Sequence, residues 1–517
     1  MSRIPLFFLT GLVAAPSLAF LATHMASPFV GWGAAAMLFV ALAVAARLYR
    51  AGGDEHVDRP VAAACLGLAL VLCLLGGQTH AFFANDDWLI RDAVLADLVA
   101  RPWPVEYERG GEMLFLRAPL GMYLVPALAG KIAGLGVAHL ALLVQNTLVI
   151  GTLLYIFAAL TERRAQKAWL LACFVLFSGW DILGQALANG IGVPARSTAF
   201  PSHLENWNIG LQYTSHVAQV FWVPNHAVAG WACVAGYLYW RAGRITAGSF
   251  AMMAGLCALW SPLALLGAIP FLARAAIADV ASRRLTFGSL VAPSLAAAAL
   301  APVLAYLVAD SQAVPHGFSP ISAVSLIRYA ALVVLEVIPF LVLGCALALR
   351  GLLGRTELAI IAASLLLIPF YDVGTVDFVM RASIPALALL ALLLGANSWP
   401  GVMGARAVPV GLAVIFLAIG AVTPAYEIGR ALVRPAFATS HCGLIESARQ
   451  APFGTTMGNY LARTGASAHT GSLLALTGHA VEVGSPERCW PDRNGDWVLH
   501  PGKGPAPERR SVSQFDR

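Results

Sequence analysis

Long apolar runs, separated by short polar segments, recur along most of this chain. They do not alternate apolar and polar positions, and each is about 17–25 residues long, enough for an α-helix to cross a bilayer. A proline directly after Trp260-Ser261 predicts a break between two of the runs. About thirteen spans are expected, near residues 4–23, 30–47, 61–78, 138–161, 168–184, 220–240, 246–260, 262–280, 287–308, 329–349, 356–371, 383–398 and 407–424. The pattern predicts an all-α fold, a polytopic transmembrane helical bundle over residues 1–425.

Composition supports this class, because 59% of the 517 residues are hydrophobic and only 12% are charged. The first run, with Arg3 before an apolar core, also has features of a secretory signal peptide. It is long for such a peptide and no clear cleavage site follows it. We therefore interpret residues 4–23 as the first span.

The positive charge of the chain, +6 in total, is concentrated in alternate loops. The basic residues concerned are Arg47, Arg50, Arg59, Arg163, Arg164, Lys167, Arg241, Arg244, Arg283, Arg284, Arg350 and Arg355. The positive-inside rule places these loops and the N-terminus in the cytoplasm. A nucleic-acid-binding patch would not recur at every second span, so no nucleic-acid partner is expected.

Two long loops and a polar tail are then expected on the opposite side, at residues 79–137, 185–219 and 426–517. The segment 117–136 is a further candidate span, but counting it would place Arg163 and Arg164 outside. We therefore expect interfacial helices in the first loop. The last residues of the tail have the composition of a disordered segment. Cys442 and Cys489 would form a disulfide if the tail faces an oxidising compartment and would otherwise stay free.

The sequence Asn85-Asp86-Asp87-Trp88 opens the first long loop. Charge beside hydrocarbon is costly and is commonly retained for function. One carboxylate, Asp86 or Asp87, is a candidate general base for an acceptor hydroxyl or amine. The alternative is that the asparagine or an aspartate before Trp88 is the N-cap of the amphipathic helix that begins there, and the two roles are compatible if each aspartate takes one.

The segment Arg117-Ala118-Pro119-Leu120 follows the acidic pair, and a span with the basic inner end Arg163-Arg164 comes next. This order resembles the GT-C glycosyltransferases, in particular the lipid A aminoarabinose transferases and the protein O-mannosyltransferases. Ala118 stands where those families commonly have proline. The resemblance implies a GT-C-like fold, and its best match is residues 80–165.

A second resemblance to these enzymes lies in the segment 371–387, where Arg381 precedes Pro385 at the start of a late span. Ala382 replaces the aromatic residue that follows the arginine in the family pattern. Arg381 at the membrane surface would bind a lipid phosphate through charge-assisted hydrogen bonds. The alternative is an interfacial anchor that pairs with Asp377.

Other candidate substrate-binding residues are Arg117, His226 and, in the second loop, His203, Glu205 and Trp207. Histidine can relay protons or hold a pyrophosphate, and the face of a tryptophan stacks on sugar rings. A histidine near a membrane interface is more commonly a hydrogen-bonded structural residue, which is the alternative for His203 and His226.

The resemblance implies an integral-membrane glycosyltransferase of the bacterial inner membrane with its active face outside. It would transfer a sugar from a polyprenyl-phosphate donor to a glycan, lipid or protein acceptor. Membrane lipids would be the other partners of the protein. No cofactor is indicated, and a divalent metal stays an open alternative. A lipid or glycan transporter and a non-catalytic subunit of an envelope-assembly complex are the alternative functions. The chain has no Walker-type loop, Gly-x-Ser-x-Gly or His-Glu-x-x-His motif to support ATP-driven transport or serine or zinc hydrolysis.

The predicted topology can be tested by cysteine labelling with a membrane-impermeant reagent. We expect single cysteines introduced near residue 165 to react only after the cells are permeabilised, and cysteines near Asp86 to react in intact cells. Labelling near residue 165 from outside would refute this topology.

Overall fold

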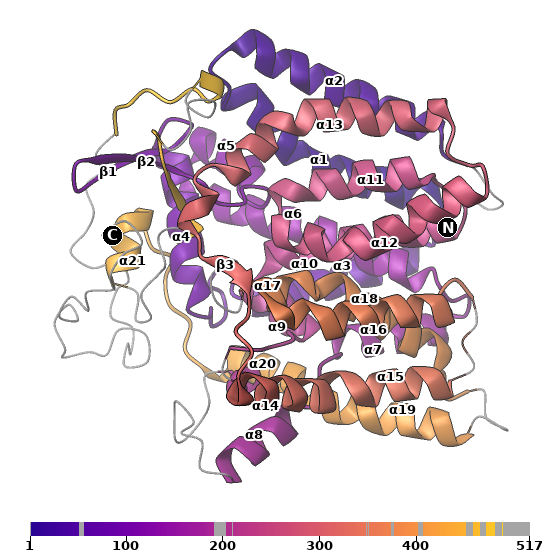
Figure 1. Ribbon diagram of the computed structural model, residues 1–517. Helices are drawn as coiled ribbons and strands as arrows, with labels where there is room; N and C mark the ends of the chain where they lie inside the picture. The colour runs from indigo at the N-terminus through magenta and orange to yellow at the C-terminus, as the bar shows by residue number, and fades with distance from the viewer. Residues whose placement is uncertain are drawn as a thin grey trace.

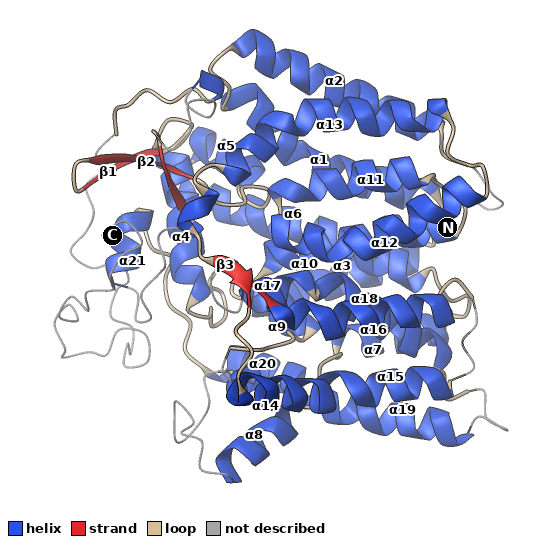
Figure 2. Ribbon diagram, viewed as in Figure 1, coloured by secondary structure: helices blue, strands red, loops and turns tan. Residues whose placement is uncertain are grey.

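The computed structural model describes residues 2–50, 56–190, 203–208, 210–347, 349, 351–373, 377–401, 407–450, 459–465, 472–480 and 489. It is 71% helical (Figures 1 and 2). The first helices are α1 Arg3–Thr23, α2 Pro28–Arg47, α3 Arg59–Leu75, α4 Asp87–Ala100, α5 Leu124–Ala133, α6 Leu135–Ala158, α7 Arg164–Val175, α8 Asp181–Gly190, α9 His216–Trp222 and α10 Pro224–Arg241. The later ones are α11 Ala247–Leu256, α12 Pro262–Ala281, α13 Phe287–Val308, α14 Ala323–Leu332, α15 Ile338–Ala346, α16 Arg355–Leu367, α17 Asp377–Ala382, α18 Ile384–Asn397, α19 Ala407–Gly420, α20 Val422–Val433 and α21 Leu444–Gln450.

Seven helical stretches in the described ranges are long and apolar enough to cross a membrane, which is consistent with a helical membrane protein. They are Arg3–Thr23, Pro28–Arg47, Leu135–Ala158, Pro262–Ala281, Phe287–Ala313, Ala323–Ala346 and Ala407–Val433. The count of thirteen is not confirmed. The run 168–184, for example, is broken because α7 ends at Val175 and Asp181 starts a separate helix.

Helices α10 and α18 form the centre of the bundle. Every residue of α10 from Pro224 to Trp240 is buried, as is every residue of α18 from Ile384 to Gly395. A helix that is apolar or tightly packed on all sides belongs inside a bundle. By contrast, α2 exposes large apolar side chains such as Phe29 and Phe39, as expected for a surface that faces lipid.

The predicted break at Trp260-Ser261-Pro262 is confirmed. Ser261 caps α12 by accepting a hydrogen bond from the amide of Ala264 at 3.1 Å, and Pro262 occupies the first turn, where its missing N–H leaves no backbone bond unmade.

Short strands correct the all-α prediction for the first long loop. Strands β1 Glu106–Arg109 and β2 Glu112–Leu116 form a hairpin, and β5 Leu461–Arg463 from the tail pairs with β2. Gly110 and Gly111, both with positive φ, form the two-residue turn of the hairpin. A second small sheet joins β3 His316–Phe318 to β4 Tyr371–Val373. Three- to five-residue strands carry too little periodicity to be recognised in a sequence.

The first loop also contains two of the expected helices, α4 and α5. Helix α5 has ten residues, or about 15 Å, so segment 117–136 does not form a transmembrane helix. The predicted domain boundary at 425/426 falls within α20 and so does not separate the bundle from the tail.

The basic loops meet at one end of the bundle. The amide of Arg50 donates to the carbonyl of Arg244 at 2.8 Å, and Arg241 Nε donates to Leu352 O at 3.0 Å. Helix α4, the β1–β2 hairpin and α21 lie at the other end (Figure 1). The segregation fits the positive-inside pattern.

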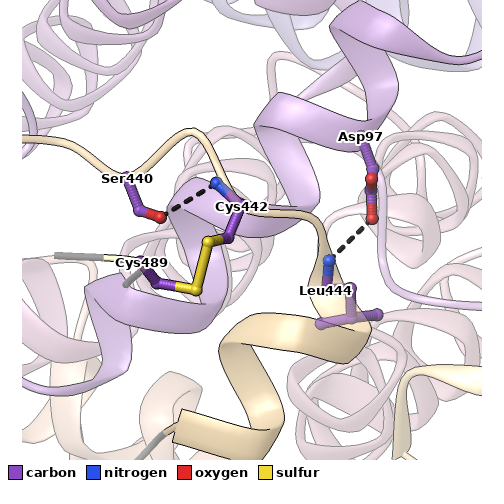
Figure 3. Close-up of a disulfide and its surroundings, with 5 residues drawn as sticks. All are labelled: Asp97, Ser440, Cys442, Leu444 and Cys489. Carbon is purple, nitrogen blue, oxygen red and sulfur yellow. Dashed lines mark hydrogen bonds between the residues drawn. A yellow bond between two sulfur atoms is a disulfide. The ribbon is translucent and has the colours of Figure 1, made fainter. Parts of the chain in front are cut away.

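The tail contains a disulfide between Cys442 and Cys489, with Cα atoms 5.3 Å apart (Figure 3). Of the two alternatives left by the sequence, the structure thus favours pairing. The final residues, for which disorder is expected, lie outside the described ranges.

Candidate functional site

The acidic pair lies at the beginning of α4. The amide of Asp87 donates to the side-chain oxygen of Asn85 at 3.1 Å, whereas Asp86 makes no capping hydrogen bond. Asn85 therefore provides the cap, and both carboxylates are left for other contacts. Each aspartate is partly exposed.

Side chains of α4 hold the pair in place by binding the break between α9 and α10. The break occurs at Pro224, which has no amide hydrogen to donate. The carbonyl of Phe221 accepts from Asn85 Nδ2 at 2.6 Å and from Trp88 Nε1 at 3.0 Å. The carbonyl of Trp222 accepts from Arg91 Nη2 at 2.6 Å. Two carbonyls at the end of α9 thus find their partners in α4.

Arg91 connects Asp87 to α10. Its Nη2 lies 3.2 Å from Asp87 Oδ2, and its Nη1 donates to Asn225 Oδ1 at 3.1 Å. The next residue, His226, has its Nδ1 2.6 Å from Ser261 Oγ. His226 interacts electrostatically with both Arg91 and Arg381, so it belongs to the surroundings of the acidic pair.

Asp86 has the electrostatics of a proton acceptor that works near neutral pH. Burial and the neighbouring Asp87 carboxylate raise its pKa to about 6, although Arg430 and Arg434 act in the opposite direction. No group in the described part of the chain donates a hydrogen bond to the Asp86 carboxylate. A partly exposed carboxylate with this pKa can take a proton from a bound group.

Arg430 of α20 and Arg434, which follows that helix directly, provide positive charge beside Asp86. The Arg430 guanidinium lies 5.0 Å from the centre of the Trp222 ring, and that of Arg434 lies 5.6 Å from the centre of the Phe83 ring. The sequence reasoning missed both arginines, because nothing local relates α20 to α4. Arg91 was not among the candidate site residues either, although its spacing of four residues from Asp87 is a local signal for an ion pair.

Arg381 lies on α17 and forms an ion pair with Asp377 at 2.7 Å, as the anchoring alternative expects. Its Nε has no hydrogen-bond partner within the described ranges. Tyr460 of the tail interacts electrostatically with Arg381 and also with Asp87 and Arg91. Arg381 and the acidic pair thus both lie within electrostatic range of one tyrosine.

Arg117 points elsewhere. Its side chain reaches the end of α13, where Nη1 donates to Leu307 O at 3.4 Å, while its amide donates to the carbonyl of Tyr460 at 2.6 Å. The hydrogen bond of its guanidinium is thus made to α13 and not to the acidic pair. Its backbone, however, contacts Tyr460, which interacts electrostatically with Asp87.

His203 and Glu205 form a buried network behind α20. His203 Nδ1 lies 2.9 Å from Glu427, and its Nε2 lies 3.1 Å from Glu205. Glu427 pairs in turn with Arg430 at 2.6 Å. In the described part of the chain, His203 and Glu205 are connected to Asp86 through Glu427 and Arg430. Their contacts therefore hold the Arg430 side chain in position.

Trp207 belongs to another part of the second loop. Its indole N–H lies 3.2 Å from Asp181 Oδ1 and 3.2 Å from Glu336 Oε1, both buried. The structure does not bring Trp207 to the acidic pair.

Among the described residues, no group of three or more histidine, cysteine, aspartate or glutamate side chains is arranged to hold a metal ion. A cavity of about 560 Å³ lies among the basic loops, between Asp58 and Arg59 of α3 and Arg164 and Lys167 of α7. It is at the opposite end of the bundle from Asp86. Comparison with protein-family models, curated proteins and solved structures found no match for this chain.

The pairing of His203 predicts a pH-dependent stability. Burial disfavours the imidazolium, but Glu205 and Glu427 raise the pKa of His203 from 6.5 to about 10. The stabilisation is therefore complete below pH 6.5 and is lost as the pH rises through about 10. We expect His203→Gln to lower the thermal unfolding midpoint in detergent near pH 6.5, and the difference from wild type to shrink towards pH 10.

His316→Gln is the matched control, since His316 lies in β3 with an ordinary hydrogen bond to Val314 O. It should leave the pH profile unchanged. A constant difference between His203→Gln and wild type across this range would contradict the ion-pair assignment.

Proposed function

We propose that this protein is a GT-C-like glycosyltransferase that transfers a sugar from a polyprenyl-phosphate donor to an envelope acceptor. The observation that carries the proposal is the state of Asp86. It is partly exposed, receives no hydrogen bond from the described residues and has a pKa raised to about 6 beside three other charged groups. Such perturbed carboxylates are typical of catalytic sites.

The proposed reaction is displacement at the anomeric carbon of the donor sugar. The acceptor oxygen or nitrogen forms a bond to that carbon while the bond from the carbon to the phosphate oxygen breaks. The acceptor proton passes to Asp86, and the electron pair of the broken bond leaves with the polyprenyl phosphate. We favour Asp86 over Asp87 as the base, because Asp87 is already paired with Arg91.

The departing phosphate needs positive charge near it. The Arg381 side chain has an exposed fraction of 18%, so its guanidinium can bind an anion while staying paired with Asp377. A polyprenyl chain would lie among the membrane lipids along the apolar helices. We assign the site to the outer face of the bacterial inner membrane, in line with the positive-inside pattern. No step of the reaction is assigned to a metal.

One observation favours transport as a second candidate function. Asp181 and Glu336 are both buried and share the Trp207 indole as a hydrogen-bond donor, and Glu336 lies in a π-helical turn, Val333–Val337, within an apolar stretch. Buried acids in membrane spans are typical of proton-coupled transporters. Asp86 is partly exposed and receives no hydrogen bond from the described residues, as suits a group that reacts with a bound substrate, and therefore we rank transport second.

Replacing Asp86 tests the proposal. We expect Asp86→Asn to lower glycan transfer from a polyprenyl-phosphate sugar at least about a hundredfold, because the general base is removed. Expression and membrane insertion should survive, since Asn85 provides the cap of α4. The wild-type rate should rise as the pH increases through about 6, where Asp86 loses its proton.

Arg381→Ala should instead weaken donor binding, at a cost of about 1.5–3 kcal/mol for a lost charged hydrogen bond. The two variants therefore separate the chemical step from donor binding. Near-normal transfer by Asp86→Asn and by Asp87→Asn would refute the enzymatic proposal and favour transport.

A further inference from the structure

The tail returns to the bundle as a strand beside the first long loop. Strand β5 pairs with β2 in antiparallel register, with Leu461 opposite Leu116 and Arg463 opposite Leu114. Arg463 also forms two contacts with the Asp310 carboxylate, at 2.9 and 3.1 Å. Backbone pairing and an ion pair together fix the position of this segment.

Pairing of β5 places the residue before it, Tyr460, between two helices of the site. The carbonyl of Tyr460 accepts from the amide of Arg117, and the side chain of its neighbour Asn459 reaches Asp377 at 3.5 Å. The Tyr460 ring interacts electrostatically with Asp87 and Arg91 on α4, and with Asp377 and Arg381 on α17. Tyr460 thus interacts with both helices that carry the charged residues of the candidate site, α4 and α17.

The hydroxyl of Tyr460 differs from those of other buried tyrosines. Tyr107 donates to Asp97 at 2.8 Å, Tyr306 to Ala118 O at 2.9 Å and Tyr237 to Glu357 at 3.0 Å. The Tyr460 hydroxyl has no such partner among the described residues, and its side chain is only partly buried. A partly exposed hydroxyl without a protein partner is open to a hydrogen bond with a bound molecule.

A second attachment holds the tail at the other end of α4. The amide of Leu444 donates to Asp97 Oδ2 at 2.8 Å, beside the Cys442–Cys489 disulfide (Figure 3). Gly443 allows this approach, because a Cβ there would lie 2.6 Å from Asp97 Oδ1. The tail therefore contacts α4 near its C-terminal end, and Tyr460 lies within electrostatic range of its first turn.

We infer that the tail contributes a substrate-binding residue to the site, in which the Tyr460 hydroxyl donates a hydrogen bond to a phosphate oxygen of the lipid donor. Arg381 supplies the positive charge on one side of that phosphate. The Arg91 guanidinium is bound to α9 and α10, so the phenol and Arg381 are the groups that we assign to the anion. The inference rests on the proposed function and names a further residue of the same site.

Tyr460→Phe tests the role of the hydroxyl, because it removes one oxygen and keeps the ring. The probe is undecaprenyl phosphate in detergent micelles, and its binding to the full-length protein is measured against phosphatidylglycerol as an anionic lipid of different headgroup. We expect Tyr460→Phe to bind the probe about tenfold more weakly than wild type, with an unchanged thermal unfolding midpoint. In a transfer assay the same variant should raise KM for the donor and leave kcat within about twofold.

Tyr329→Phe is the matched control, since Tyr329 donates to Leu366 O on another helix and should retain wild-type binding. If wild type prefers undecaprenyl phosphate and Tyr460→Phe binds it equally well, the role of Tyr460 is refuted and the proposed function stands. If wild type shows no preference over phosphatidylglycerol and no transfer, the proposed function itself is refuted.

Discussion

The candidate site depends on the break between α9 and α10. A proline at position 224 cannot continue the backbone hydrogen-bond pattern, so the carbonyls of Phe221 and Trp222 need donors from elsewhere. Asn85, Trp88 and Arg91 supply them. Because an unpaired carbonyl away from water is costly, this contact orients the first turn of α4. The acidic pair is held in that turn.

Two sets of ion pairs surround the acidic pair: Asp87 with Arg91, and Glu427 with His203 and Arg430. Asp87 is neutralised by Arg91, which leaves Asp86 as the carboxylate open to a ligand. Behind Arg430, the carboxylate of Glu427 accepts from His203, Trp222 and Arg430 itself. A buried charge is tolerated when it is both paired and hydrogen-bonded. The second loop therefore determines where the positive charge beside Asp86 lies.

The two ends of the bundle differ in kind. At one end, basic loops contact one another through backbone hydrogen bonds and ion pairs. At the other, the first long loop and the tail combine into a small sheet and a disulfide-linked segment over α4. The three-stranded sheet and the disulfide-linked segment both lie at this second end. Outside a bilayer the backbone is not restricted to helices as it is within one.

The sequence by itself determined the helical membrane character, the break at Ser261-Pro262 and the position of the acidic pair at the start of a helix. These features follow from apolar run length, proline geometry and capping, all of which act over a few residues. Only the tertiary structure decided that Asn85 caps the helix, that Arg430 and Arg434 lie beside Asp86, and that Tyr460 lies within electrostatic range of both Asp87 and Arg381. The physical reason is that partners for buried carbonyls and charges come from whichever segment packs against them. Here those segments, α20 and β5, are far from α4 along the chain.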